Sequence, residues 1–164
     1  MISKSFKLIE VEELLAKSRT SIRRRQHLNL HASYEEPCQR LLNAIQKNSY
    51  IRPHRHALDP KQESLFALSG LLALICFDDS GEVLSIQKFG SEKYVVQNDV
   101  LLGVELPPSV WHTVIALVDD SILLEIKAGP FRVDAAKEHA SWAPDENLTQ
   151  ALSYLQHLQD MVKS

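Results

Sequence analysis

The sequence predicts an all-β core of the sandwich, jelly-roll or barrel type, with helical segments at both ends. Short apolar runs separated by turn residues fill residues 23–133, a pattern typical of antiparallel strands. No alternation of strands with long helices occurs, which disfavours a doubly wound parallel sheet. With 164 residues, 45% of them apolar, the chain suits one domain. We expect an N-terminal helical segment 1–22, a β core 23–133 and a C-terminal helical extension 134–164.

The first element expected is a short amphipathic helix near residues 5–18, where apolar and acidic residues alternate at helical spacing (Phe6, Ile9, Leu14, Leu15). The strands of the core are expected where β-branched, aromatic or other apolar residues cluster, at 65–68, 71–77, 83–89, 94–96, 100–106, 110–117 and 122–126. Asp79-Ser80-Gly81 lies between two of these runs and predicts a β-hairpin.

The last element expected is a second amphipathic helix. Pro144, Asp145 and Glu146 are typical of a helix start, because acidic groups favour the positive end of the helix dipole. An apolar stripe then recurs at intervals of three and four residues (Leu148, Leu152, Leu155, Leu158, Val162). We expect this stripe to dock on the β core.

Charge and composition narrow the function classes. The net charge of −3 gives no general attraction to nucleic acid or to an anionic membrane. The longest apolar run, 71–77, is too short to cross a bilayer. Acidic residues occupy the place where a signal peptide would need its apolar stretch. We therefore expect a cytoplasmic protein with no nucleic-acid or membrane partner.

The most informative residues are His54, His56, Glu63 and His112. His54 and His56 are two apart, so in a strand both side chains would point to one face. Glu63 follows after a loop, and His112 opens a later strand. Three imidazoles and a carboxylate suit Fe, Mn, Ni, Zn or Cu better than Ca or Mg. A surface histidine pair explains His54 and His56 equally well from their spacing alone.

These residues resemble the two motifs of the cupin superfamily. There, a His-x-His pair, a later Glu and a distant His bind one metal inside a double-stranded β-helix. His54, His56, Glu63 and His112 match these positions in order. The gap between the pair and Glu63 is longer than usual, and Ser109 stands where the second motif has Gly. The resemblance implies a jelly-roll barrel with one divalent transition metal (Fe, Mn, Ni or Zn).

A second resemblance covers nearly the whole chain. The segments 49–56, 110–114 and 129–131, together with Trp142-Ala143-Pro144, are similar to the WbuC-type cupin-fold metalloproteins of the RmlC-like superfamily. Members of that family often occur near bacterial surface-polysaccharide genes. The resemblance implies the cupin fold and the metal, and it suggests polysaccharide biosynthesis as the setting. It leaves the reaction and any catalytic residue undefined.

Five polar residues are candidates for contact with a small polar or anionic ligand: Arg24, Arg40, Asn43, Tyr50 and Arg52. Arg52 is two residues before His54, so in a continuous strand its side chain would point to the same face as those of His54 and His56. An inward guanidinium would then need either a structural partner or a bound anion. Arg40 and Asn43 would share one face if their segment were helical. Tyr50 could donate its hydroxyl to a ligand or simply fill the core. Arg24 lies in a basic run that solvent alone could explain.

Three hypotheses follow for the function. The first is a metal-dependent enzyme acting on a small polar metabolite such as a sugar or sugar derivative, as an isomerase, an epimerase or an oxygenase. The second is a non-catalytic, metal-dependent binding protein, and the third is a barrel in which the histidines only pack. Cupins share their fold among many functions. The oligomeric state stays open, and a homodimer is one alternative, because cupins are often dimers and exposed edge strands gain from being covered.

Overall fold

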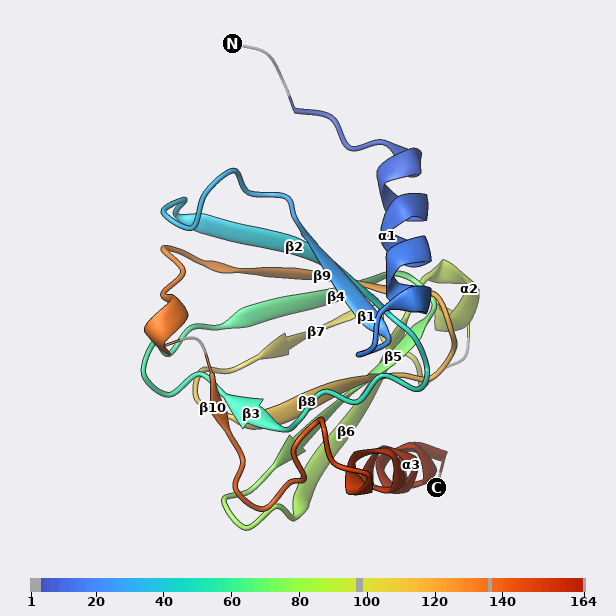
Figure 1. Ribbon diagram of the computed structural model, residues 1–164, viewed down its shortest axis with the longest axis vertical. Coiled ribbons are helices and arrows are strands. Elements are labelled where there is room, and N and C mark those ends of the chain that lie inside the picture. Colours follow the sequence, from blue (N-terminus) through green and yellow to red (C-terminus); the bar gives the residue numbers. More distant parts are fainter. Residues whose placement is uncertain (1–3, 97–98, 136, 164) are drawn as a thin grey trace.

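The computed structural model describes residues 4–96, 99–135 and 137–163. Within these ranges, ten strands form two five-stranded sheets that lie face to face (Figure 1). The first sheet has the order β1 (Arg25–Asn29), β2 (Cys38–Ile45), β9 (Ser121–Ala128), β4 (Glu63–Ser69), β7 (Gly103–Leu106). The second has the order β10 (Glu138–His139), β3 (His54–Arg55), β8 (Trp111–Ala116), β5 (Leu71–Phe77), β6 (Val83–Gly90).

The sheets form a jelly roll, in agreement with the predicted all-β core. All pairings of the named strands are antiparallel, and several of them, such as β2–β9, β4–β9 and β5–β8, join distant parts of the sequence. The predicted hairpin joins β5 to β6. Between β4 and β5 the chain turns at Gly70, whose φ of +77° favours glycine because it has no side chain.

Three apolar clusters hold the layers together. The inner cluster fills the space between the sheets, with Leu65, Leu74, Phe89 and Val114 among its members. A second cluster lies between the second sheet and helix α3 (Gln150–Lys163). A third lies between the first sheet and helix α1 (Leu8–Thr20). In β8, even-numbered residues face the inner cluster and odd-numbered residues face α3, so this strand is buried on both sides.

The helices at the two ends of the chain, α1 and α3, begin at other residues than predicted, and some of their predicted apolar residues are exposed. α1 begins at Leu8, where the Glu10 carboxylate accepts a hydrogen bond from the Lys7 main chain, and Phe6 and Ile9 are exposed. α3 begins at Gln150 rather than at Pro144. Asp145 accepts a hydrogen bond from the Asn147 main chain and holds a turn there instead.

Some strand predictions were wrong. Residues 94–96 were expected to form a strand, but the short helix α2 (Glu92–Val95) covers most of them. The expected strand 100–106 is reduced to β7, Gly103–Leu106. β1 and β2 were not delimited, because their polar residues weaken the apolar pattern. A 3-10 turn, η1 (Val133–Ala135), precedes the short strand β10.

Candidate metal centre

His54 and His112 are direct neighbours in the second sheet. They are register partners across the β3–β8 ladder, and their ring centroids are 4.4 Å apart. The alternation of β8 turns His112 inward together with Val114. Neighbouring strands therefore bring together two histidines that are far apart in sequence.

His56 and Glu63 complete the group from the chain between β3 and β4. His56 follows β3 directly, and Glu63 is the first residue of β4 in the opposite sheet. The His56 Nε2 atom lies 3.0 Å from Oε1 of Glu63. The site therefore joins the two sheets at one end of the jelly roll.

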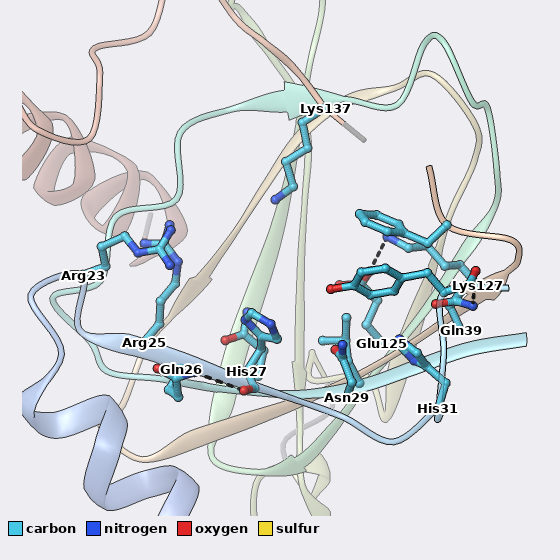
Figure 2. Close-up of a pocket in the computed structure, with 14 residues that line it drawn as sticks. Arg23, Arg25, Gln26, His27, Asn29, His31, Gln39, Glu125, Lys127 and Lys137 are labelled. Carbon is cyan, nitrogen blue, oxygen red and sulfur yellow. Dashed lines mark hydrogen bonds and ion pairs between the residues drawn. The ribbon is translucent and has the colours of Figure 1, made fainter. Parts of the chain in front are cut away.

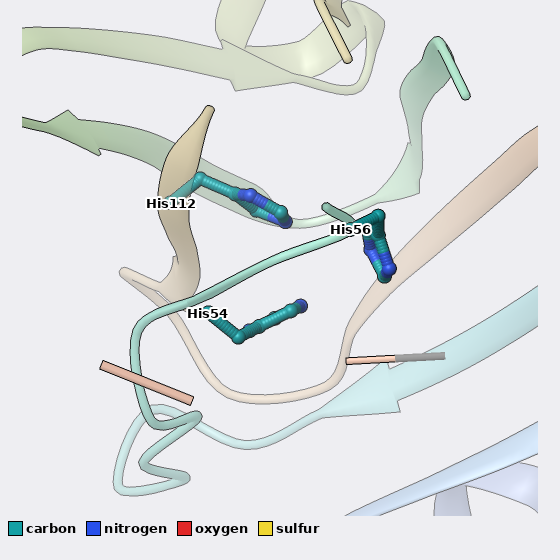
Figure 3. Close-up of side chains that lie close together, drawn as sticks. All are labelled: His54, His56 and His112. Carbon is teal, nitrogen blue, oxygen red and sulfur yellow. The ribbon is translucent and has the colours of Figure 1, made fainter. Parts of the chain in front are cut away.

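The three imidazoles form a buried cluster. Each of them offers a nitrogen, and these nitrogen atoms lie within 4.8 Å of one another. Figure 3 shows the rings of His54, His56 and His112 directed toward a common space. All three side chains are buried, as is Glu63. A spacing of this kind allows one ion to contact all three rings.

Hydrogen bonds orient two of the rings. Nδ1 of His54 lies 3.0 Å from the Arg52 carbonyl oxygen, and Nδ1 of His112 lies 2.9 Å from that of Val110. A ring that donates its Nδ1 hydrogen to a carbonyl keeps a lone pair on Nε2, the arrangement found in metal-binding histidines. Burial lowers the pKa of His112 to about 4 and that of His54 well below its usual value. Both rings are thus neutral at pH 7.

Glu63 is held as a carboxylate. Burial raises its pKa, but the hydrogen bond with His56 and the charge of Lys127 outweigh that effect, so the pKa lies below its usual range. Lys127 Nζ is 3.0 Å from Glu63 Oε1 and 2.7 Å from Glu125 Oε1. Burial lowers the pKa of Lys127, whereas the two carboxylates raise it above its usual value.

The donor set fits a divalent transition metal. Neutral imidazoles and one carboxylate are ligands that Fe, Mn, Ni and Zn accept, whereas Ca and Mg prefer oxygen donors throughout. Ion pairing within the site keeps the carboxylate charged without a metal. The three buried histidines could therefore bind a metal of this class.

Two cavities that share part of their lining lie at this cluster. The inner cavity, of about 60 Å³, is lined by the three histidines and Glu63. A larger outer cavity of about 320 Å³, which we call the outer chamber, lies between β1, β2 and the segment before β10. The residues that line both cavities are Asn43, Glu125, Lys127 and Lys137. A small ligand could thus extend from the histidines into the chamber.

Two of the predicted ligand-binding residues lie elsewhere. Arg52 donates to the Ala140 carbonyl oxygen and pairs with Asp145 in a groove beside α3. The alternation of side chains along a strand does not apply to Arg52, because β3 begins only at His54. Tyr50 is buried beneath α3 and donates its hydroxyl to the Pro144 carbonyl oxygen. Neither lines the two cavities.

Arg24 and Arg40 also lie outside the lining of the two cavities. Arg24 donates to Asn48 and lines a groove beside α3. Arg40 and Asn43 were expected to share a helical face, but β2 is a strand, in which residues three apart point to opposite sides. Arg40 pairs with Glu36, whereas Asn43 lines both cavities.

Sequence reasoning missed most of the chamber. Its floor includes Arg25, His27 and Asn29, which alternate along β1 and face one side. That alternation is a signal that the sequence contained. Lys137 gave no signal, since it follows η1 in a segment without periodicity. Figure 2 shows its side chain reaching into the chamber opposite His27 and Asn29.

The family model that matches the sequence is described as "Domain of unknown function (DUF6016)" and covers residues 7–89. This range is half of the chain and includes β1 to β5 and nearly all of β6, with His54, His56 and Glu63 of the site. The chain belongs to this family. The DUF6016 chain has no match among curated proteins. The WbuC-type resemblance stays a prediction.

Solved structures establish the fold of the DUF6016 chain. Protein SO0799 from Shewanella oneidensis is similar over 84% of this chain and 83% of its own, with a TM-score of 0.57 and 12% identity. Oxalate decarboxylase from Bacillus subtilis is similar over 70% of this chain and 27% of its own, with a TM-score of 0.50 and 14% identity. KdgF from Halomonas sp. is similar over 67% of this chain and 82% of its own, with a TM-score of 0.48 and 15% identity. The likeness to the first two structures shows the cupin fold, as predicted.

No helix among the described residues is both long and apolar enough to span a membrane.

Proposed function

We propose that this chain is a metal-dependent cupin enzyme acting on a small polar metabolite. The convergence of His54, His56 and His112 beside the ionised Glu63 carries the proposal. These four residues would hold one divalent transition metal in the inner cavity. Such a metal, when bound, polarises a carbonyl or hydroxyl oxygen of a ligand.

The residues of the chain itself have distinct roles in this proposal. Lys127 keeps Glu63 ionised and in place through its 3.0 Å contact. Glu125 and Lys137 line both cavities, so they would carry a proton to or from a ligand that lies beside the histidines. The inner apolar cluster beneath the site excludes bulk water from that side.

The substrate class rests on the chamber. Most of the residues that line it have polar side chains, among them Asn29, Asn43 and His31, and such side chains suit the hydroxyl groups of a sugar or a sugar derivative. Isomerisation or epimerisation is the reaction type we favour. A link to surface-polysaccharide synthesis and a homodimeric assembly stay predictions that rest on family resemblance.

Metal analysis tests this proposal most directly. Protein purified without a chelator should contain about one transition metal ion per chain by mass spectrometry. The variants His54→Ala and His112→Ala should lose it. His157→Ala, which changes an exposed histidine on α3, should retain it. Metal content that is indifferent to both site variants would refute the metal centre.

Turnover separates an enzyme from a binding protein. The metal-loaded protein and a chelated sample should be compared for interconversion of sugars and sugar derivatives by NMR. Loss of turnover after chelation, with recovery after the metal is restored, is the expected result. Saturable ligand binding without any conversion would instead assign the chain as a metal-dependent binding protein.

A further inference from the structure

The outer chamber contains buried polar atoms that lack a partner among the described residues: His31 Nε2, Gln39 Oε1 and Asn43 Oδ1. All three residues line the chamber, and His31 and Gln39 are only 6% and 2% exposed. A buried polar atom without a hydrogen bond costs free energy, so such atoms in a native protein call for an explanation. A ligand in the chamber would supply the missing partners.

The orientation of the Gln39 amide is fixed by its neighbours. Its Nε2 donates to three main-chain carbonyl oxygens, and the shortest of these bonds, 2.8 Å, goes to Glu36. Turning the amide over would place Oε1 against those carbonyls. Gln39 therefore presents an acceptor, as does Asn43 through Oδ1. Acceptors of this kind are satisfied by hydroxyl groups and not by a carboxylate.

His31 adds a third polar position. Its Nδ1 is engaged by the Arg40 main chain, 2.8 Å from the carbonyl oxygen and 3.0 Å from the nitrogen. Nε2 is therefore left to the chamber, as a donor or an acceptor according to the tautomer. A hydroxyl group can serve in both roles, which makes it the partner that suits either tautomer.

The charges of the chamber favour an anion. Arg25 is paired with Glu146, and Lys127 is paired with Glu63 and Glu125. Arg23 and Lys137 have no ion pair among the described residues, although both line the chamber. Lys137 also lines the inner cavity beside the histidines. Its cation thus borders both cavities.

We propose that the ligand of this site is a small polyhydroxylated carboxylic acid, with its carboxylate at Lys137 beside the histidine cluster and its hydroxylated body in the outer chamber. This inference rests on the proposed function and narrows its substrate class. A volume of about 320 Å³ falls at the lower end of small-molecule sites, roughly 300–1,000 Å³. The chamber therefore suits a ligand of monosaccharide size.

Calorimetric titration of the metal-loaded full chain tests the inference. The probes are D-glucuronate and D-gluconate, compared with D-glucose, which lacks the charge, and with hexanoate, which lacks the hydroxyl groups. At least one of the two hydroxy acids should bind about tenfold or more tightly than either comparison compound, because both kinds of group are needed. Equal or weaker binding of both hydroxy acids would overturn the inference.

Two variants locate the contacts. Lys137→Met should weaken binding of the hydroxy acid by about tenfold or more and leave the weak binding of glucose unchanged. Asn43→Ala should weaken binding of the acid and of glucose alike, because it removes a hydroxyl partner. Lys163→Met, on the exposed end of α3, is the control and should change neither.

Metal content measured on the same samples separates the two proposals. Loss of metal in His54→Ala with retention in Lys137→Met supports the metal centre whatever the probes do. With the metal bound, no effect of Lys137→Met on the hydroxy acids would overturn this inference and leave the metal centre intact. A chain that binds no metal would remove the proposed function, and the inference with it.

Discussion

Glu63 and Lys127 are direct register partners across the β4–β9 ladder, and Lys127 Nζ lies 3.0 Å from Glu63 Oε1. The carboxylate beside the histidine cluster therefore has its own counter-cation, supplied by the neighbouring strand. In the absence of a metal, this pair keeps a buried carboxylate from standing alone. A bound metal would take over part of that role.

Replacement of Lys127 should therefore affect the metal-free protein most. Lys127→Met leaves Glu63 buried without its cation, which should lower the free energy of unfolding by about 3 kcal/mol in the metal-free state. With saturating metal the loss should be smaller, because the metal also compensates Glu63. Urea denaturation of both forms measures the difference.

The exposed Lys163 offers a matched control for this prediction. Lys163→Met should change stability by less than about 0.5 kcal/mol in either state. If Lys127→Met lost the same stability with and without metal, the proposed compensation of Glu63 by the metal would be wrong.

Ser109 occupies a strained position three residues before His112. Its φ of +63° lies in the left-handed region, which costs a residue with a side chain about 1–2 kcal/mol. Ser109→Gly should relieve this cost, partly offset by the greater freedom of glycine in the unfolded chain. We expect a net gain of about 0.5 kcal/mol, seen as a higher urea midpoint with an unchanged slope. A lower midpoint would show that the serine side chain stabilises the turn.

The sequence predicted the apolar strands well because their burial leaves a direct pattern. β5 agrees with its expected range, and β6, β8 and β9 differ from theirs by one or two residues. β1 and β2 were missed as delimited strands because one face of each lines a polar chamber rather than the core. Their polar alternation resembles that of an exposed segment.

The sequence predicted the histidines of the site but not the residues that line the chamber. His54 and His112 meet through strand register, which a family motif encodes and a spacing argument does not. For Arg52 and Tyr50 the structural alternative holds, because β3 begins only at His54 and the two side chains pair or pack beside α3 instead. Lys137 could not be found, since its position depends on how an irregular segment folds back over the chamber.

Asp120 should make stability depend on pH in acid. Its carboxylate accepts hydrogen bonds from Arg19 at 2.5 and 2.9 Å and from Gln46 at 2.9 Å. The hydrogen bond from Arg19 is the main cause that lowers the pKa of Asp120 below 3.8. A lowered folded-state pKa stabilises the protein above the unfolded value, and this contribution is lost as pH falls through the folded value.

Asp120→Asn tests this dependence, because asparagine also tolerates the φ of +58° at this position. The pair is partly exposed, so wild type should be more stable by only about 0.5–1 kcal/mol at pH 7. The difference should shrink below about pH 4. Urea denaturation at pH 7, 5 and 3 measures it, and a difference that stays constant with pH would exclude an ionic origin.

α3 provides a test of how the apolar stripe is used. Leu152 and Leu158 both belong to the predicted stripe, yet Leu152 is 62% exposed and Leu158 only 1%. Leu158→Ala should cost about 2–5 kcal/mol, because it opens a cavity beneath the helix. Leu152→Ala, with the same change in helix propensity, should cost less than about 0.5 kcal/mol. Metal content should stay the same in both variants, because α3 packs on the outer face of the second sheet. Equal losses of stability in the two variants would mean that α3 contacts the sheet through a different face.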